Sequence, residues 1–279
     1  MPDESANPRP DELGYDLALL TDVGTNRPDN EDSCGQAPDP HGGVIFAVAD
    51  GVGGYEGGEV ASQMAIELTI KAFSKSPANW GQARRLARAV QEANIAIHNR
   101  ALAVPELRRM ATTLTAVAIK DGAVNVAHVG DCRLYIAQNG RIKQVSRDHT
   151  LVGERVRMGM MTAAEGRHHP ERSALSRSVG RDLIVSLDRI SIGLDRDDRL
   201  ILCSDGLHGV LEDNEIERIS RNLEAGEACR KLVDSANARG TADNLTVAVF
   251  RQLAEPAAPA HPHRRGFGRF WASIARLWR

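Results

Sequence analysis

Five aspartates stand where an apolar run begins or ends, next to glycine or a small polar residue: Asp32, Asp50, Asp131, Asp205 and Asp243. The ends of strands are where a sheet scaffold presents side chains to a cleft. Acidic side chains that converge at such a place repel one another strongly unless cations lie among them. Mg²⁺ and Mn²⁺ prefer oxygen ligands of this kind. The pattern therefore predicts a divalent metal centre.

Each aspartate taken alone has a simpler interpretation, because Asp-Gly is a common turn pair. Asp121-Gly122 fits that interpretation, since it joins two strand-like runs as a hairpin turn. Five such aspartates with few histidines or cysteines nearby favour the metal centre. The four cysteines are far apart in the sequence and form no CxxC pair, which argues against a zinc knuckle or a redox motif.

The stretch IFAVADGVGGYEGGEVAS, residues 45–62, places a series of glycines directly after Asp50. Glycine raises the entropy cost of ordering the backbone, so something must come close to the chain here. A nucleotide is one candidate. The stretch lacks GxxxxGK[ST], however, and GxGxxG fails because Glu56 stands at the third glycine position. We expect metal ions, water and a substrate side chain beside Asp50.

Alternating and apolar runs predict a series of strands. They cover residues 15–22, 44–50, 112–119, 123–129, 133–138, 141–146, 184–191, 198–204 and 245–251. Asp121-Gly122 and Asn139-Gly140 join two pairs of these strands by tight turns that need positive φ at both central residues. The hairpins make the pairing antiparallel in this part of the chain.

Helices are predicted over residues 56–74, 80–102, 212–221 and 225–238. In the second of these, Asn79 is the expected N-cap and apolar residues recur on one face. Antiparallel strands with helices in separate blocks indicate an α+β domain, in which two sheets pack together with helices outside.

The composition is that of an ordinary soluble domain. The 279 residues are 42% hydrophobic and 26% charged, with a formal net charge of −2. A balance so close to neutral argues against nucleic-acid binding through a global basic field. The N-terminus lacks the apolar segment of a signal peptide, and no apolar run is long enough to span a membrane. We expect a cytoplasmic monomer.

The chain divides into four expected segments. Residues 1–14 are rich in Pro, Asp and Glu and are predicted to be a disordered lead. Residues 15–253 form the folded domain, within which an irregular polar stretch at about 147–179 is a candidate flap over a site. Residues 254–263 are an Ala/Pro-rich linker. The last segment, 264–279, carries five arginines and no acidic residue.

Helical spacing would place the aromatic and apolar residues of 264–279 on one side, as in an amphipathic helix. Such a basic segment is too short to cross a bilayer, but it could lie on an anionic membrane surface or dock on a partner. The alternatives are packing against its own domain and disorder. The linker favours a detached segment. Our hypothesis is that this segment brings an otherwise cytoplasmic protein to a membrane surface.

Seven motifs carry a resemblance to a known family: RPDNED, ADGVGG, ATTLTAV, HVGDCRLY, LSRSVG, LILCSDGL and ADNLTVAVF. In order and spacing they are similar to those of the metal-dependent type 2C Ser/Thr protein phosphatases, the PPM family, in their bacterial form. The resemblance covers residues 15–251. It implies a four-layer α-β-β-α sandwich, in which two mostly antiparallel sheets are flanked by helix pairs and a metal centre lies at one end.

The resemblance also implies roles for individual residues. Asp50 would bridge two Mn²⁺ or Mg²⁺ ions, and the Gly51 carbonyl would bind one of them. Asp205 and Asp243 would bind the other ion. Arg27 falls on the arginine that binds the substrate phosphate in the family.

Four more positions have counterparts in the family. Glu31 and Asp32 would hold waters bound to the metals, and Asn244 would orient the carboxylate beside it. Asp131 is similar to the residue that binds a third, weaker metal in bacterial members.

No serine or cysteine with an adjacent base stands out, so a covalent intermediate is not indicated. Two metals can lower the pKa of a bridging water and clamp the transferring phosphoryl group, and arginine suits bidentate binding of phosphate oxygens. Val52 stands where some relatives have histidine, a suspected general acid, so the proton donor is open. His128 is one alternative, although a histidine on a strand is more often structural. A metal-bound water is the simpler donor.

The predicted function is metal-dependent hydrolysis of phosphoserine and phosphothreonine in proteins, reversing a bacterial Ser/Thr kinase. The expected partners are phosphorylated proteins, among them a cognate kinase and its substrates, and not nucleic acid. Two alternatives stay open. One is a catalytically dead relative that binds phosphoproteins as a regulatory module, and the other is a hydrolase of small phosphoesters.

Overall fold

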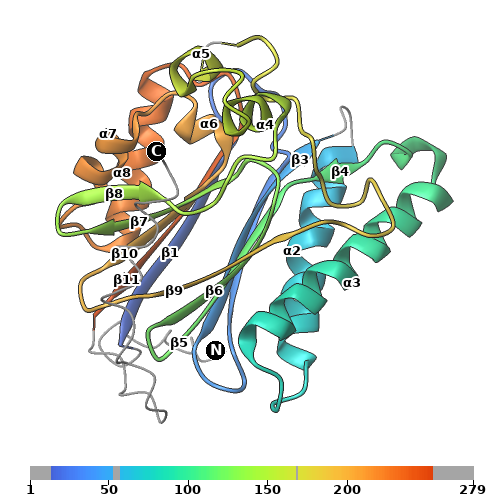
Figure 1. Cartoon of the computed structure of the whole chain (residues 1–279), viewed down its shortest axis with the longest axis horizontal. Coiled ribbons are helices and arrows are strands. Elements are labelled where there is room, and N and C mark those ends of the chain that lie inside the picture. The colour runs from blue at the N-terminus through green and yellow to red at the C-terminus, as the bar shows by residue number, and fades with distance from the viewer. Residues whose placement is uncertain (1–13, 53–56, 168, 254–279) are drawn as a thin grey trace, which may run out of the picture.

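Two antiparallel β-sheets packed face to face form the centre of the molecule (Figure 1). The computed structural model describes residues 14–52, 57–167 and 169–253. The first sheet has the order β1 (Tyr15–Asp22), β11 (Leu245–Gln252), β10 (Arg199–Cys203), β7 (Arg133–Gln138) and β8 (Arg141–Gln144). The second has the order β2 (Asp32–Pro38), β3 (Val44–Val52), β5 (Leu114–Lys120), β6 (Ala123–Val129) and β9 (Asp188–Gly193), and β4 (Ala111–Thr112) also pairs with β3.

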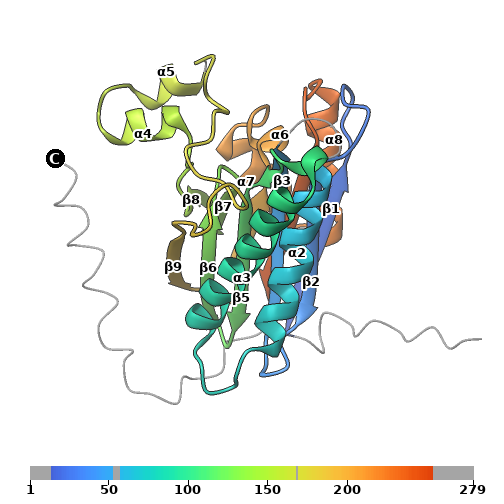
Figure 2. The same cartoon turned by 90° about the vertical axis from the view of Figure 1, so that its right-hand side faces the viewer.

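Pairs of helices cover the outer face of each sheet (Figures 1 and 2). α2 (Gly57–Lys75) and α3 (Gln82–Ala103) pack on the second sheet, whereas α7 (Asp213–Ser220) and α8 (Ala225–Ala238) pack on the first. The predicted α+β architecture of four layers is therefore confirmed. The remaining short elements are α4 (Leu151–Arg157), α5 (Ala163–Arg167), α6 (Asp205–His208) and the 3-10 turn η1 (Pro105–Leu107).

The central strands are buried on both faces, which explains their continuous apolar sequences. In β3, Ala47 and Ala49 pack toward the helices α2 and α3, whereas Phe46 and Val48 face the other sheet. The rings of Phe46 and Phe250 stack with centroids 6.2 Å apart, and so join the two sheets at the middle of the sandwich.

Both predicted hairpin turns are confirmed. The φ angles of Asp121 and Gly122 are 50° and 73°, and those of Asn139 and Gly140 are 51° and 72°. Positive φ at both central residues is the requirement that the Asx-Gly pairs meet.

Two predictions around the second sheet are wrong. The predicted strands did not include residues 32–38, DSCGQAP. They form β2 by pairing with β3 along their whole length. The strand expected at 184–191 is β9, which begins only at Asp188. Asn94 of α3 holds the preceding segment against the helix, since its Nδ2 donates to the carbonyls of Asp182 and Leu183 at 2.9 and 3.1 Å.

The predicted N-cap of α3 is also wrong. The helix begins at Gln82 and its N-cap is Gly81, not Asn79. The N–H of Trp80 donates to the carbonyl of Pro77 at 3.1 Å, so Asn79 lies within a tight turn before the helix.

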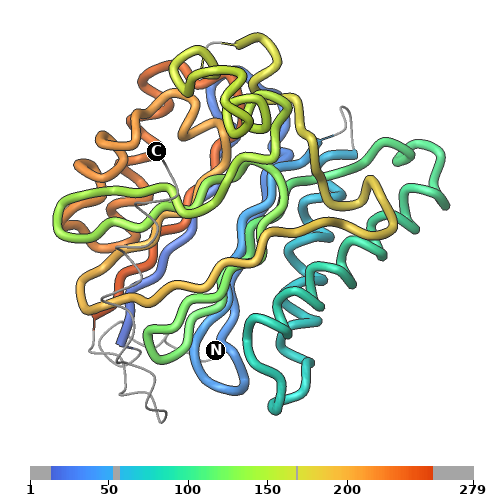
Figure 3. Tube along the Cα trace, in the orientation of Figure 1, coloured from blue at the N-terminus to red at the C-terminus, as the bar shows by residue number. Residues whose placement is uncertain are grey.

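The topology brings the predicted metal-site residues to one end of the sandwich. Because β10 and β11 are antiparallel neighbours, the end of one lies beside the start of the other. In the second sheet, the start of β2 lies opposite the end of β3. The segment 147–179, which carries α4 and α5, stands beyond the same end (Figure 2). We call it the flap segment, and Figure 3 shows its path as the yellow-green trace at the top.

None of the helices within the described residues is long and apolar enough to cross a membrane. Nearly all of the predicted N-terminal lead falls outside the described residues, and so do the linker 254–263 and the basic segment 264–279. Their predicted properties remain predictions.

A buried ion pair ties the second sheet to its helices. Arg85 of α3 and Asp39 of the β2–β3 loop form two parallel hydrogen bonds of 2.7 and 2.8 Å, and their side chains are 2% and 0% exposed. Arg85 also donates to the carbonyl of Phe73 in α2 at 3.0 Å and stacks on its ring. One guanidinium therefore connects three elements.

We predict that Arg85→Met lowers the free energy of unfolding by about 3–5 kcal/mol, because it leaves the Asp39 carboxylate buried without its partner. Urea denaturation of the variant and the parent measures the loss. The control is Arg88→Met, one turn further along α3, where the exposed Arg88–Glu92 pair contributes about 0.5 kcal/mol or less. Equal losses in the two variants would contradict the role of the buried pair.

Candidate metal centre

Asp50 and Asp32 lie directly opposite each other on β3 and β2. The backbone of Asp50 is fixed, because its N–H donates to Thr113 Oγ1 at 2.9 Å and its carbonyl accepts from the Thr113 N–H at 2.8 Å. Asp32 is buried, and its Oδ2 accepts a hydrogen bond from Ser204 Oγ at 2.7 Å. Ser204 follows β10, so this bond connects the two sheets at the site.

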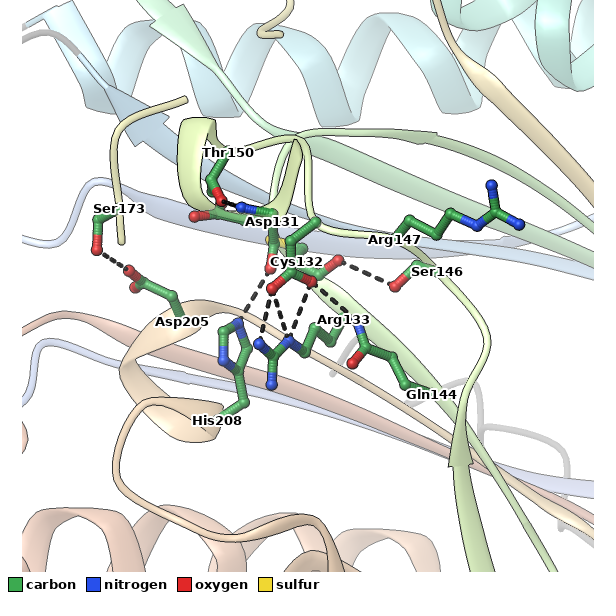
Figure 4. A network of polar contacts seen from close by, with 12 residues as sticks. Asp131, Cys132, Arg133, Gln144, Ser146, Arg147, Thr150, Ser173, Asp205 and His208 are labelled. Carbon is green, nitrogen blue, oxygen red and sulfur yellow. Dashed lines mark hydrogen bonds and ion pairs between the residues drawn. The ribbon is translucent and has the colours of Figure 1, made fainter. Parts of the chain in front are cut away.

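Asp205 is the first residue of α6 and follows Ser204 directly. Its Oδ1 is buried without a hydrogen-bond partner, and its Oδ2 lies 3.5 Å from Ser173 Oγ of the flap segment (Figure 4). A buried carboxylate oxygen that lacks a donor costs free energy. Asp205 therefore has an open position for a ligand.

Asp131 lies buried in the loop between β6 and β7. Its carbonyl accepts a hydrogen bond from His208 Nε2 at 3.0 Å, as Figure 4 shows. The preceding Gly130 has a φ of 107°, and its N–H donates to His149 Nδ1 at 3.1 Å. A Cβ at Gly130 would lie 2.5 Å from Thr113, so this position requires glycine. These contacts fix the loop that presents Asp131.

Negative charge accumulates where these residues meet. Burial, and then the charges of Asp32, Asp205, Asp131 and Asp243, raise the pKa of Asp50 well above its usual value. Burial raises the pKa of Asp32 to about 7, and burial with the Asp243 charge raises the pKa of Asp205 to about 6. Burial and the Asp205 charge also raise the pKa of Asp131. The ionised forms therefore destabilise the fold until positive charge is supplied.

Arg27 supplies one such charge at the rim. Its Nη2 lies 2.8 Å from Asp243 Oδ2, and its Nε donates to the carbonyl of Ala242 at 3.3 Å. The two charged side chains are 46% and 40% exposed. An ion pair so accessible to water is weak, so either partner can exchange it for another ligand.

Asn244 contacts the carboxylate of Asp243, as expected, but its side chain has a different task. Its backbone N–H, not its side chain, donates to Asp243 Oδ1 at 2.9 Å. The side-chain Nδ2 donates to the carbonyls of Val23 and Asp29 at 2.8 and 2.9 Å, and Oδ1 accepts from the Glu31 N–H at 2.8 Å. One amide therefore holds the whole segment 23–31 against the start of β11.

The protein's own backbone is what comes close to the chain after Asp50. A Cβ at Gly51 would lie 2.3 Å from the Gly58 carbonyl oxygen and 2.6 Å from that of Glu31. A Cβ at Gly58 would lie 2.7 Å from the Glu31 carboxylate. The first turn of α2 therefore packs directly on β3 and on Glu31. We had expected only metal ions, water and a substrate side chain near these glycines, and not this backbone packing.

The donor chemistry fits divalent cations. Several carboxylates are buried together, one has an oxygen without a partner, and their charges oppose one another. In the described part of the chain, no three acidic, histidine or cysteine side chains are grouped closely enough to hold an ion as they stand. Mutual repulsion and the Arg27–Asp243 pair both favour this spacing. Ligation by Asp243 would therefore replace its contact with Arg27.

The ring of His128 lies in the core, and both of its nitrogens are hydrogen-bonded. Thr115 Oγ1 donates to its Nδ1, and its Nε2 donates to the Arg147 carbonyl, both at 2.8 Å. The ring is fully buried, and burial lowers its pKa to about 4. The structure therefore favours the structural interpretation over the catalytic one. Val52 is 41% exposed and carries no titratable group.

Three residues that the sequence interpretation did not single out contact the aspartates: Ser204, Ser173 and His208. Ser204 stands in the motif LILCSDGL, so its position beside Asp205 was visible, but the contact with Asp32 was not. Ser173 lies in the segment that the sequence predicted as a flap over a site, but no local pattern indicated that Ser173 or His208 would contact the aspartates.

The fold and this acidic end agree with a known protein family. The family model described as protein phosphatase 2C matches residues 25–247. The chain belongs to the protein phosphatase 2C family. Its similarity to curated relatives extends over most of their length. It is 34% identical to the serine/threonine phosphatase stp of Listeria monocytogenes over 236 residues, which cover 81% of this chain and 92% of that protein.

Other relatives and solved structures agree. The phosphatase is 32% identical to the protein phosphatase PhpP of Streptococcus pneumoniae, across 87% of this chain and 99% of that one. It is similar to the crystal structure of the Mycobacterium tuberculosis phosphatase PstP/Ppp, with a TM-score of 0.78, 32% identity and coverage of 86% and 99%. A PstP catalytic domain in complex with two manganese ions matches with a TM-score of 0.75, 30% identity and the same coverage.

The chain is therefore a Ser/Thr protein phosphatase of the bacterial type, and it is metal-dependent like its family. The alternative of a regulatory module without activity does not agree with these relatives.

The raised pKa of Asp205 predicts how pH affects the metal-free phosphatase. The folded state takes up this proton near pH 6, whereas a free carboxyl does so near 3.8. Ionised Asp205 therefore costs stability, and the cost grows as pH rises between these values. In chelator, Asp205→Asn should match the parent at pH 4 and exceed its free energy of unfolding by up to about 3 kcal/mol at pH 8.

Urea denaturation across this pH range tests the expectation. Asp121→Asn, in an exposed turn, is the matched control and should show no pH-dependent difference from the parent. Excess Mn²⁺ should reverse the order at pH 8, because the cation stabilises the parent more than the variant. A parent that stays more stable than Asp205→Asn in chelator at pH 8 would contradict the proposed repulsion.

Proposed function

We propose that Asp50, Asp205 and Asp243, with the Gly51 carbonyl, hold two Mn²⁺ or Mg²⁺ ions at the acidic end of the sandwich. The observation that carries the proposal is the burial of several carboxylates whose charges raise one another's pKa values. The manganese ions in the similar PstP structure support the choice of cation. When bound, the cations activate water for attack on phosphorus and stabilise charge on the phosphoryl oxygens.

We assign supporting roles to three further acids. Asp32 is kept in place by Ser204, and Glu31 by its packing on Gly58, so both can accept hydrogen bonds from the waters of the site. Asp131 is the proposed ligand of a third ion, since it is buried and shares the negative field of Asp205.

Arg27 is the proposed phosphate-binding residue. Its side chain lies at the rim, and its present partner Asp243 is the carboxylate that a cation would take. Releasing that pair frees the planar guanidinium to form two parallel hydrogen bonds with phosphate oxygens. Arg27 would thereby hold the phosphoryl group in a fixed orientation for attack.

Water of the site is the proposed proton donor to the leaving oxygen of serine or threonine. Val52 offers no proton, and both nitrogens of His128 are engaged in the core.

The proposed substrates are phosphorylated proteins, including those of a cognate bacterial Ser/Thr kinase. The flap segment exposes the apolar side chains of Met158 and Met160, at 62% and 73%. Such side chains offer contact area to a polypeptide that a small phosphoester cannot use. Turnover of a phosphothreonine peptide and of an aryl phosphate, compared side by side, separates the two substrate classes.

We predict that Asp50→Asn lowers kcat for a phosphothreonine peptide in Mn²⁺ by about 10²-fold or more, because it removes one of the carboxylate charges that would hold the cations. Chelator should abolish the activity of the parent. Asp121→Asn serves as the control and should keep full turnover. Full turnover by Asp50→Asn would contradict the two-metal assignment.

We predict that Arg27→Ala lowers kcat/KM by about 10- to 150-fold, the equivalent of a lost charge-assisted hydrogen bond of about 1.5–3 kcal/mol. The same variant should bind Mn²⁺ at least as tightly as the parent, because Asp243 no longer has a competing partner. Steady-state kinetics and calorimetric titration of Mn²⁺ measure the two effects. Loss of Mn²⁺ affinity in step with activity would show that Arg27 only supports the metal ligands.

A further inference from the structure

A second concentration of charge lies at the opposite end of the first sheet. A cavity of about 610 Å³ opens there between the β7–β8 turn, the end of α7 and the ends of β10 and β11. These elements meet at the left in Figure 1, away from the flap segment at the top. Three arginines and two carboxylates are among the lining residues: Arg199, Arg221, Arg251, Asp197 and Glu217. The volume suits a small molecule.

Arg199 and Arg251 are direct partners in the register of β10 and β11. Their side chains therefore leave the sheet on the same face, where like charges opposite each other are destabilising. The next positions on that face, Ile201 and Val249, belong to the apolar core under α7 and α8. Two cations thus stand where the alternation of the strands otherwise places apolar residues.

Two of the three arginines have carboxylate partners. Arg221 Nη2 lies 2.6 Å from Glu217 Oε2, and Arg251 Nη2 lies 3.0 Å from Asp197 Oδ1. Although Arg251 is paired with Asp197, its Nε is buried and has no hydrogen-bond acceptor among the described residues.

Arg199 is the one of these three arginines that has no carboxylate partner in the part of the chain that the structure describes. It is 7% exposed and donates to the Ser220 carbonyl at the end of α7. Among the described residues, no carboxylate lies within 4.0 Å of its guanidinium, and Asp16, Asp197 and Glu217 act on it only from further away. Burial and then the Arg251 charge lower its pKa. A buried cation without a partner is costly, and an anion would offset the cost.

We propose that this cavity binds a small molecule carrying a phosphate group, held between Arg199 and Arg251. Guanidinium groups match the geometry of phosphate oxygens, and both arginines line the space. Arg199 begins β10, which spans about 13 Å to Cys203 at 3.3 Å per residue, and Asp205 comes two residues after the other end of the strand. The site is therefore distinct from the catalytic end.

Inorganic phosphate is the probe, and its titration is followed by calorimetry with the full chain. Because Arg27 is the proposed phosphate ligand at the catalytic end, the parent for this comparison is Arg27→Ala in chelator. This parent should keep one phosphate site, and adding Arg199→Met should weaken it tenfold or more. Adding Arg88→Met removes a charge from an exposed pair instead and should leave the affinity unchanged.

Thermal unfolding separates ligand binding from a purely structural role of Arg199. Phosphate should raise the melting temperature of the Arg27→Ala parent and not that of the variant with Arg199→Met. If Arg199 only held the Ser220 carbonyl, its loss would lower the melting temperature equally with and without phosphate, and the proposal would be wrong. Equal phosphate affinity in the two proteins would also overturn it. Neither measurement depends on catalytic activity, so the outcome is independent of the proposed metal ligands.

Discussion

Repulsion among buried carboxylates is the constraint on which the organisation of this phosphatase depends. Asp32, Asp50, Asp131 and Asp205 are all held by backbone or side-chain contacts at one end of the sandwich, although burial and mutual charge raise the pKa of each. A protein that needed only stability would place apolar residues there. The arrangement becomes favourable when cations compensate the charge, so the fold stores free energy that metal binding releases.

The surrounding structure keeps these side chains from relaxing apart. Ser204 holds Asp32 from the other sheet, the hydroxyl of Thr113 fixes the backbone at Asp50, and the amide of Asn244 fixes the segment that carries Glu31. The opposite end of β10 and β11 carries an excess of positive charge instead, because several arginines lie close together there. The same two strands therefore join a centre that needs cations to a cavity that needs an anion.

The sequence predicts well those features that depend on local patterns. β3, β10 and β11 are buried on both faces and so have continuous apolar runs, and the hairpin turns depend on Asx-Gly pairs. β2 escaped prediction because its strand conformation comes from pairing with β3. The bonds of Ser204 and Asn244 join residues up to 221 positions apart, and the Arg199–Arg251 pair exists only through register. Such contacts leave no periodic signal in the chain.

The first and last strands of the folded domain pair along their whole length, with Tyr15 opposite Gln252 and Asp22 opposite Leu245. The loop bearing Arg27 is attached by Asn244, near the other end of the chain. A nascent chain on the ribosome therefore cannot complete its catalytic end until nearly the whole domain has been synthesised, and closing such distant contacts is slow. A chain that ends before β11 would consequently lack both the partner of its first strand and the amide that holds the Arg27 loop.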